Sequence, residues 1–295
     1  MGATGHIGHY LVEELLKKAK KVRAIGRNPN KLQELKAKGA EIHSGDLTDI
    51  AFLAKAFHGC QAVFSLIPPG LEEDDMEVFR EKCAETIDQA IVKAKITHVI
   101  NLSSIGAGAS ASTGPIKELH RHEERLDLIP NLNVLHVRPG FFMENFSMLL
   151  PGIKKSGHLA LSIKKDLPLP MVATQDIALK IAELLIAMKF TGSSVFEFAG
   201  PREMTMAEAA QILGKAMAKP DLKYVQLSYE QAEKAMIEVG MKHHVAKLMV
   251  EMHKAFNEGK IAPTQKITAD HRGKTTLEQY CKELALTFRP GKKAA

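Results

Sequence analysis

Apolar positions in the first half of the chain alternate between helical and extended spacing. Ile7, Leu11 and Leu15 recur on one helical face, and residues 62–67 form an apolar run that is ended by two prolines and a glycine. Helical and extended segments follow one another in this way along the chain. The predicted helices are residues 7–17, 30–38, 49–57, 74–94 and 116–128, and the predicted strands are residues 21–25, 41–43, 62–67, 98–102 and 133–137.

Strands separated by helices of this length are typical of a parallel sheet with helices on both faces. Beyond residue 150, Pro151-Gly152 and two further prolines indicate a loop-rich insert before helix 176–188 and strand 195–198 return to the sheet. The remaining chain is mostly helical, with helices predicted at 206–218, 229–239, 244–257 and 276–286. We therefore predict an α/β, doubly wound, Rossmann-like dinucleotide-binding domain over residues 1–150 plus about 172–198, and a smaller, mostly helical substrate-side lobe over 151–171 and 199–295.

Composition mainly excludes classes of protein. The 295 residues are 45% hydrophobic and 25% charged, which is ordinary for a globular chain. The net charge of +6 comes from interleaved basic and acidic residues without a basic, aromatic stripe, which argues against a nucleic-acid partner. No apolar run reaches the roughly 18 residues of a membrane span, and no secretory leader opens the sequence. Three cysteines far apart fit a reducing compartment, so we expect a cytoplasmic protein with no metal site and an undetermined oligomeric state.

Three glycines at a spacing of three residues directly precede the first predicted helix. The unpaired N–H groups and the dipole of a helix N-terminus stabilise a phosphate there. Glycine lets the backbone approach the diphosphate and lets the helix pack closely on the sheet. Steric demands of a helix-entry turn are the alternative explanation. If the turn binds a dinucleotide, the binding residues are Gly2, Thr4, Gly5, His6, Ile7 and Gly8.

The residues that follow strand 21–25 indicate which dinucleotide would bind. An acidic residue there would bind the ribose hydroxyls of NAD and repel the extra phosphate of NADP. This chain instead has Arg27-Asn28, with Lys31 one helical turn later. A guanidinium can pair bidentately with a 2′-phosphate, so NADP(H) is favoured over NAD(H). The alternative is that Arg27 is a solvated loop cation.

Asp46 and Leu47 follow strand 41–43, where a carboxylate can accept from the adenine amino group while its neighbour packs on the ring. The competing interpretation is local: Asp46 braces the turn, and Thr48 or Asp49 caps the next helix. The two interpretations are compatible.

These segments together resemble the NmrA-like family, atypical members of the short-chain dehydrogenase/reductase group. The resemblance rests on residues 2–8, 22–29 and 45–49, and on Val137-Arg138-Pro139-Gly140-Phe141-Phe142-Met143-Glu144-Asn145, and it spans the first half of the chain. It implies NAD(P) binding, often NADP(H). It also implies that Leu66, Ile67, Pro68 and Ser103 line the cofactor, and that Pro139, Phe141, Phe142, Met143 and Asn145 form the substrate pocket near the nicotinamide.

Two departures from the family pattern bear on function. The glycine motif normally follows an apolar strand at the centre of the sheet, and here it begins at Gly2. Without that strand, neighbouring backbone groups would be unpaired. Three explanations stay open: the true start lies upstream, another segment fills the gap, or the cofactor site is impaired.

The second departure is the lack of the Tyr-x-x-x-Lys pair, in which a tyrosine donates a proton as hydride arrives. In the corresponding stretch Lys117 and His120 share a helix face, and His120 could donate a proton or be a surface histidine paired with Glu123 or Glu124. Lys117, His120 and Ser104 are the candidate catalytic residues.

The leading hypothesis from the sequence is an NADPH-dependent oxidoreductase that transfers hydride to a small carbonyl, quinone or conjugated substrate. A quinone accepts hydride readily, so weak acid catalysis would suffice. The rival is a non-catalytic NADP(H) redox sensor, a role also known in the family, which would bind a regulatory protein. A protein that binds no cofactor is the third possibility.

Overall fold

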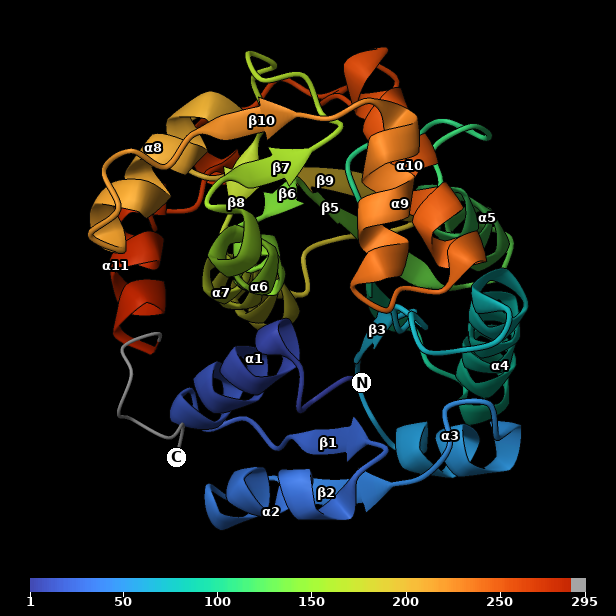
Figure 1. The fold of residues 1–295 in the computed structure, drawn as a ribbon. Helices are drawn as coiled ribbons and strands as arrows, with labels where there is room; N and C mark the ends of the chain where they lie inside the picture. Colours follow the sequence, from blue (N-terminus) through green and yellow to red (C-terminus); the bar gives the residue numbers. More distant parts are fainter. Residues whose placement is uncertain (288–295) are drawn as a thin grey trace.

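The computed structural model describes residues 1–287, and the end of the predicted C-terminal lobe, residues 288–295, lies outside the described residues. Its centre is a parallel four-stranded sheet in the order β3-β4-β5-β9, beside a parallel pair β1-β2 (Figure 1). These strands are β1 (Arg23–Gly26), β2 (Glu41–Ser44), β3 (Val63–Leu66), β4 (His98–Leu102), β5 (Asn133–Pro139) and β9 (Ser193–Phe198). The predicted return of the chain to the sheet is confirmed by the pairing of β9 with β5.

Helices pack on both faces of the four-stranded sheet. They are α1 (His6–Lys17), α3 (Ile50–Phe57), α4 (Met76–Ala94), α5 (Ile116–Asp127) and α7 (Thr174–Ala187), whereas α2 (Pro29–Ala37) packs on the pair β1-β2. Alternate side chains of each strand point to opposite faces. Phe64 and Ile100 therefore pack with α1 and α7, whereas Val63 and Val99 pack with α3, α4 and α5. The doubly wound architecture predicted from the sequence is confirmed.

No strand formed by residues 1–287 lies between β1 and β3. The first residues of the chain instead bridge the pair β1-β2 and the four-stranded sheet. The Met1 nitrogen donates to the Phe64 carbonyl of β3 at 2.8 Å. The Ala3 N–H donates to the Ile25 carbonyl of β1 at 3.1 Å. Residues 1–3 therefore hold the glycine turn between the carboxyl ends of β1 and β3.

The rest of the chain forms a lobe over one end of the sheet, shown at the top of Figure 1. Its elements are β6 (Phe141–Phe142), α6 (Asn145–Ser156), β7 (Leu159–Leu161), β8 (Met171–Val172), α8 (Met206–Ala216), β10 (Tyr224–Gln226), α9 (Tyr229–Glu238), α10 (His243–Asn257), a 3-10 turn η1 (Ala269–His271) and α11 (Leu277–Thr287). The helical prediction for this part is confirmed, although two short parallel pairs, β6-β8 and β7-β10, were not predicted. The domain boundaries stay a prediction.

Helix α6 corrects the predicted loop around Pro151-Gly152, which lies inside the helix. A proline removes one helical hydrogen bond, which made a break the expected outcome. Leu150 and Ile153, on either side, are both buried in the lobe's core, and their burial outweighs that local cost. Within residues 1–287, no helix is long and apolar enough to cross a membrane.

Candidate cofactor-binding site

The glycine turn is tight enough that side chains would disrupt it. Gly2 has φ of +62°, and the Gly5 N–H donates to the Gly2 carbonyl at 3.0 Å. A Cβ added to Gly8 would lie 2.1 Å from that same carbonyl oxygen. Helix α1 begins at His6, with no side-chain cap and no acidic residue in its first turn. The first-turn N–H groups therefore keep their capacity to bind an anion, and the backbone fits a dinucleotide diphosphate.

A cavity of about 600 Å³ opens at the carboxyl ends of β1 and β2. Arg27 and Asp46, which the sequence places in an adenosine site, both line it, and Lys82 and Phe79 reach it from α4; the adenosine role stays a prediction. Its other lining residues are Gly45, Leu47, Thr48 and Glu73. Sequence reasoning did not find Lys82, because its place at the cavity depends on how α4 packs against α3 and the sheet. Two cations therefore face a cavity of the size of a nucleotide pocket.

Asp46 braces the local turn and also lines the cavity, and its hydrogen bond to adenine stays a prediction. Its carboxylate accepts from the Thr48 N–H at 2.9 Å and also lines the cavity. That backbone hydrogen bond is the main reason why the pKa of Asp46 is lowered, with further contributions from Lys82 and Arg27. Asp49 caps α3 by accepting from the Ala51 N–H at 2.8 Å. An ionised Asp46 is therefore available as a hydrogen-bond acceptor.

Asn28 and Lys31 lie close to this cavity along the chain but are placed differently. The Asn28 side chain caps α2 by accepting from the Asn30 and Lys31 N–H groups, at 2.9 and 3.4 Å. Lys31 is exposed on α2 and is not among the residues that line the cavity. The side chain of Asn28 is already engaged locally, and the roles of both residues in cofactor binding stay predictions.

The segments predicted to line the other half of a dinucleotide lie at the carboxyl ends of β3 and β4. Leu66 packs against the turn, where a Cβ on Gly2 would lie 2.7 Å from its methyl group. Ser103 is buried, and its hydroxyl has no hydrogen-bond partner within residues 1–287. The Ser104 hydroxyl donates to the Ile105 carbonyl at 3.0 Å. Thr113, later in the same loop, also has a buried hydroxyl without a partner among the described residues, so both side chains have unused hydrogen-bonding capacity.

The other candidate catalytic side chains already have partners. Lys117 forms an ion pair with Glu77 of α4. His120 contacts the Ala107 carbonyl through Nδ1 at 2.8 Å, so that nitrogen is the donor, and its Nε2 lies 3.5 Å from Glu124. These contacts match the paired-histidine interpretation, and the proton-donor role of His120 stays untested.

The predicted substrate-pocket residues lie together where β5 ends and α6 begins. The Phe141 ring lies 5.9 Å from Phe146 and 6.5 Å from Phe256 of α10. Met143 is buried beside them, Pro139 is the last residue of β5, and Phe142 forms β6 with Phe141. Asn145 is the first residue of α6. Phe141 and Met143 pack in the core of the C-terminal part and Phe142 packs with the cluster of α1 and α7, and the role of the segment in binding a substrate stays a prediction.

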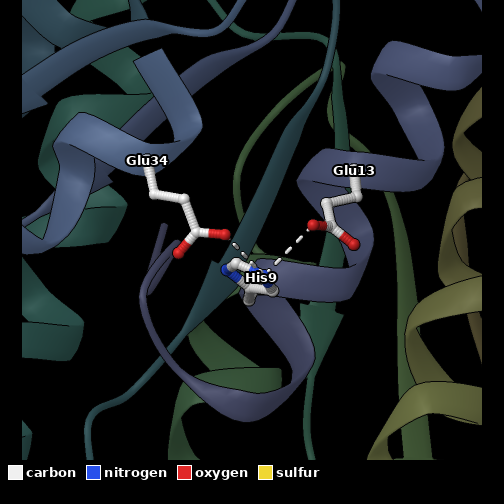
Figure 2. A group of neighbouring side chains, drawn as sticks. All are labelled: His9, Glu13 and Glu34. Carbon is white, nitrogen blue, oxygen red and sulfur yellow. Dashed lines mark ion pairs between the residues drawn. The ribbon is translucent and has the colours of Figure 1, made fainter. Parts of the chain in front are cut away.

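One cluster outside these segments has the residue types of a metal site. His9 Nε2 lies 3.2 Å from Glu13 and 3.9 Å from Glu34, as Figure 2 shows. The Lys38 ammonium donates to both carboxylates, and these hydrogen bonds to Glu13 and Glu34 raise the pKa of Lys38. A cation of the chain itself thus already compensates these charges. The cluster carries no argument for a metal, and the expectation of none stays a prediction.

Comparisons with known proteins agree with this architecture. The model of the NmrA-like family matches residues 1–283. The NAD(P)H azoreductase of Xenophilus azovorans is 25% identical over 98% of both chains. The NADPH-dependent quinone oxidoreductase of Escherichia coli, solved with NADPH, superposes with a TM-score of 0.81 at 24% identity, covering 96% of this chain and 98% of that one. NmrA, described as a negative transcriptional regulator and solved with NAD, has a TM-score of 0.72 at 17% identity, covering 97% and 94%.

Proposed function

Because the chain belongs to the NmrA-like family, we propose that it is an NADP(H)-dependent oxidoreductase that reduces a small quinone, carbonyl or conjugated acceptor by hydride transfer. The observation that carries the proposal is the uncapped glycine turn at α1, whose Gly8 leaves no room for a Cβ. The similarity to an NAD(P)H azoreductase over nearly the whole chain supports an oxidoreductase.

The adenosine end of the cofactor is assigned to the cavity beside β1 and β2. Arg27 and Lys82 would bind the 2′-phosphate from two sides, and Asp46 would accept from the adenine amino group. The N–H groups of the turn would bind the diphosphate. NADP(H) is favoured because both cations would lose their anionic partner with NAD(H).

At the other end, a bound nicotinamide supplies the hydride that the acceptor takes up. Ser103 is assigned a hydrogen bond to this half of the cofactor because its buried hydroxyl is otherwise unpartnered. Phe141 and Met143 would exclude water from the acceptor. The Tyr-x-x-x-Lys pair is absent from the sequence, so acceptors that need little proton donation, such as quinones, are favoured over simple ketones.

Calorimetric titration of wild type, Arg27→Glu and Lys82→Glu with NADPH and NADH tests the cofactor assignment. A charge-assisted hydrogen bond contributes about 1.5–3 kcal/mol, so the affinity of each variant for NADPH should be lower than that of wild type by roughly tenfold to a hundredfold. NADH affinity should change by less than about threefold, since NADH lacks the contacted phosphate. Lys93→Glu, at an exposed position in the last turn of α4, is the matched control for charge. Equal losses for both dinucleotides would show that neither cation contacts the 2′-phosphate.

A sensor that binds NADP(H) without turnover is the second candidate, favoured by the structural likeness to a protein described as a transcriptional regulator. NADPH oxidation with a panel of quinones and azo dyes separates the two. Turnover supports the reductase, whereas zero turnover alongside measurable NADPH affinity supports the sensor. Failure to bind any dinucleotide would refute both.

A further inference from the structure

Arg80 of α4 is a buried cation that contacts two loops at the carboxyl edge of the sheet. Its Nη1 donates to the Pro68 carbonyl at 3.4 Å, and its Nη2 donates to the Pro115 carbonyl at 3.0 Å. Its Nε lies 3.7 Å from a carboxylate oxygen of Glu118, which is also buried. One guanidinium therefore joins α4, the loop after β3 and the first turn of α5.

Stability alone does not account for this pair. Burial lowers the pKa of Arg80 and raises the pKa of Glu118, so the surroundings disfavour both charged forms. Neither Glu118 carboxylate oxygen has a hydrogen-bond partner within residues 1–287. Apolar residues of similar volume are often as stabilising as a buried ion pair, or more so. The pair instead fixes the distance between the Pro68 and Pro115 carbonyls, to which the guanidinium donates.

The two loops follow β3 and β4, whose carboxyl ends are predicted to line the nicotinamide half of the cofactor and where the proposed function places Ser103. Pro68 ends the segment that follows β3, and Pro115 ends the loop that begins at Ser103 after β4. Lys117, in the same first turn of α5, is also tied to α4 through its ion pair with Glu77. The adenosine cavity, in contrast, is lined by Arg27 and Lys82 and does not include Arg80.

We propose that Arg80 is a positioning residue for hydride transfer: through the Pro68 and Pro115 carbonyls it sets the spacing of the loops after β3 and β4, and thereby the orientation of the nicotinamide toward the acceptor. This proposal rests on the proposed function. Arg80 acts through the two loops and does not contact the reacting atoms.

The test compares the double variant Arg80→Met/Glu118→Met with wild type and with Arg125→Met. The double variant removes both charges, so neither is left buried alone. Arg125→Met is the matched control, because Arg125 also ties α5 to α4, through Asp88 at 2.8 Å and through Glu81, but contacts neither loop. The measurements are the urea midpoint, the affinities for NADPH and for 2′,5′-ADP, the emission of bound NADPH, and single-turnover reduction of menadione.

The double variant should keep the urea midpoint and the 2′,5′-ADP affinity of wild type, because the adenosine cavity is intact. Its single-turnover rate should fall by roughly tenfold to a hundredfold, and the emission of bound NADPH should shift, because the nicotinamide is misplaced. Arg125→Met should lower the urea midpoint while leaving the emission and the rate unchanged. If the Met variant does not fold, Arg80→Gln/Glu118→Gln removes both charges while keeping a polar side chain at each position.

A double variant with the emission and the rate of wild type would overturn the proposal and leave Arg80 a structural residue. Wild type that binds NADPH without reducing menadione or any other acceptor of the quinone and azo-dye panel would refute the oxidoreductase function separately. In that case the role of Arg80 is judged from the emission of bound NADPH and from the ratio of NADPH to 2′,5′-ADP affinity. A change of these two quantities in the double variant would support the positioning role, and wild-type values would overturn it. Wild type that binds no NADPH would overturn both.

Discussion

Protonation of His253 should destabilise the protein as the pH falls below neutrality. His253 lies on α10, is buried, and its Nδ1 lies 2.9 Å from the Ser162 hydroxyl. Desolvation by burial lowers its pKa from 6.5 to about 4. Between about pH 4 and 6.5 the unfolded state therefore binds a proton at His253 more readily than the folded state does. The free energy of unfolding rises with pH between about 4 and 6.5, and this stabilisation is lost as the pH falls through that window.

The size of the effect follows from the shift. At about 1.4 kcal/mol for each pKa unit, the full shift changes the free energy of unfolding by about 3 kcal/mol. About 2 kcal/mol of this stabilisation is lost between pH 7.5 and 5. His253→Asn keeps a polar partner for Ser162 but cannot titrate. Wild type should therefore lose about 2 kcal/mol more than His253→Asn over that interval in urea unfolding.

Other groups titrate in the same range, and the difference between wild type and variant removes their contribution. His58→Asn, at an exposed position, controls for the loss of a histidine. Parallel pH dependences for wild type and His253→Asn would refute the reasoning, because the His253 imidazole would then bind protons equally well in the folded and unfolded states.

Two glycine substitutions should have opposite effects on stability. Gly8→Ala should destabilise the protein by about 1–3 kcal/mol in urea unfolding and lower the affinities for NADPH and NADH alike, because the added Cβ would meet backbone atoms of Gly2 and Ala3. Unchanged binding would contradict the turn geometry. Gly152→Ala should stabilise by about 0.5–1 kcal/mol, because the position lies inside α6 with no atom within 4 Å of the added Cβ, and a lower thermal midpoint would disagree with that placement.

Local signals in the sequence account for most of the fold. Each of these signals lies within about a dozen residues: the glycine turn, the apolar spacing of α1 and the apolar run of β3. Such signals predicted the elements and their order. The cap of α3 by Asp49 was likewise a local signal. Such features are set by backbone conformation and by one buried face, which a single sequence displays.

Contacts between distant segments could not be predicted in the same way. The pairing of β7 with β10 joins residues more than sixty positions apart, and α6 continues through Pro151 only because of burial in the lobe. Lys82 reaches the cavity through the packing of α4, and Arg80 meets Pro115 from another helix. Sequence spacing carries no information on these distances, so the second cation and the buried guanidinium were found only in the structure.

The most direct test of the account is a titration of the ¹⁵N-labelled protein with NADPH, followed by amide chemical shifts. If the turn binds the diphosphate through its backbone N–H groups, the amides of residues 5–8 should show the largest changes at saturation, with smaller changes around Arg27 and Lys82. Saturable NADPH binding that leaves the amides of residues 5–8 unmoved, or no binding at all, would contradict the assignment of this turn as the dinucleotide site.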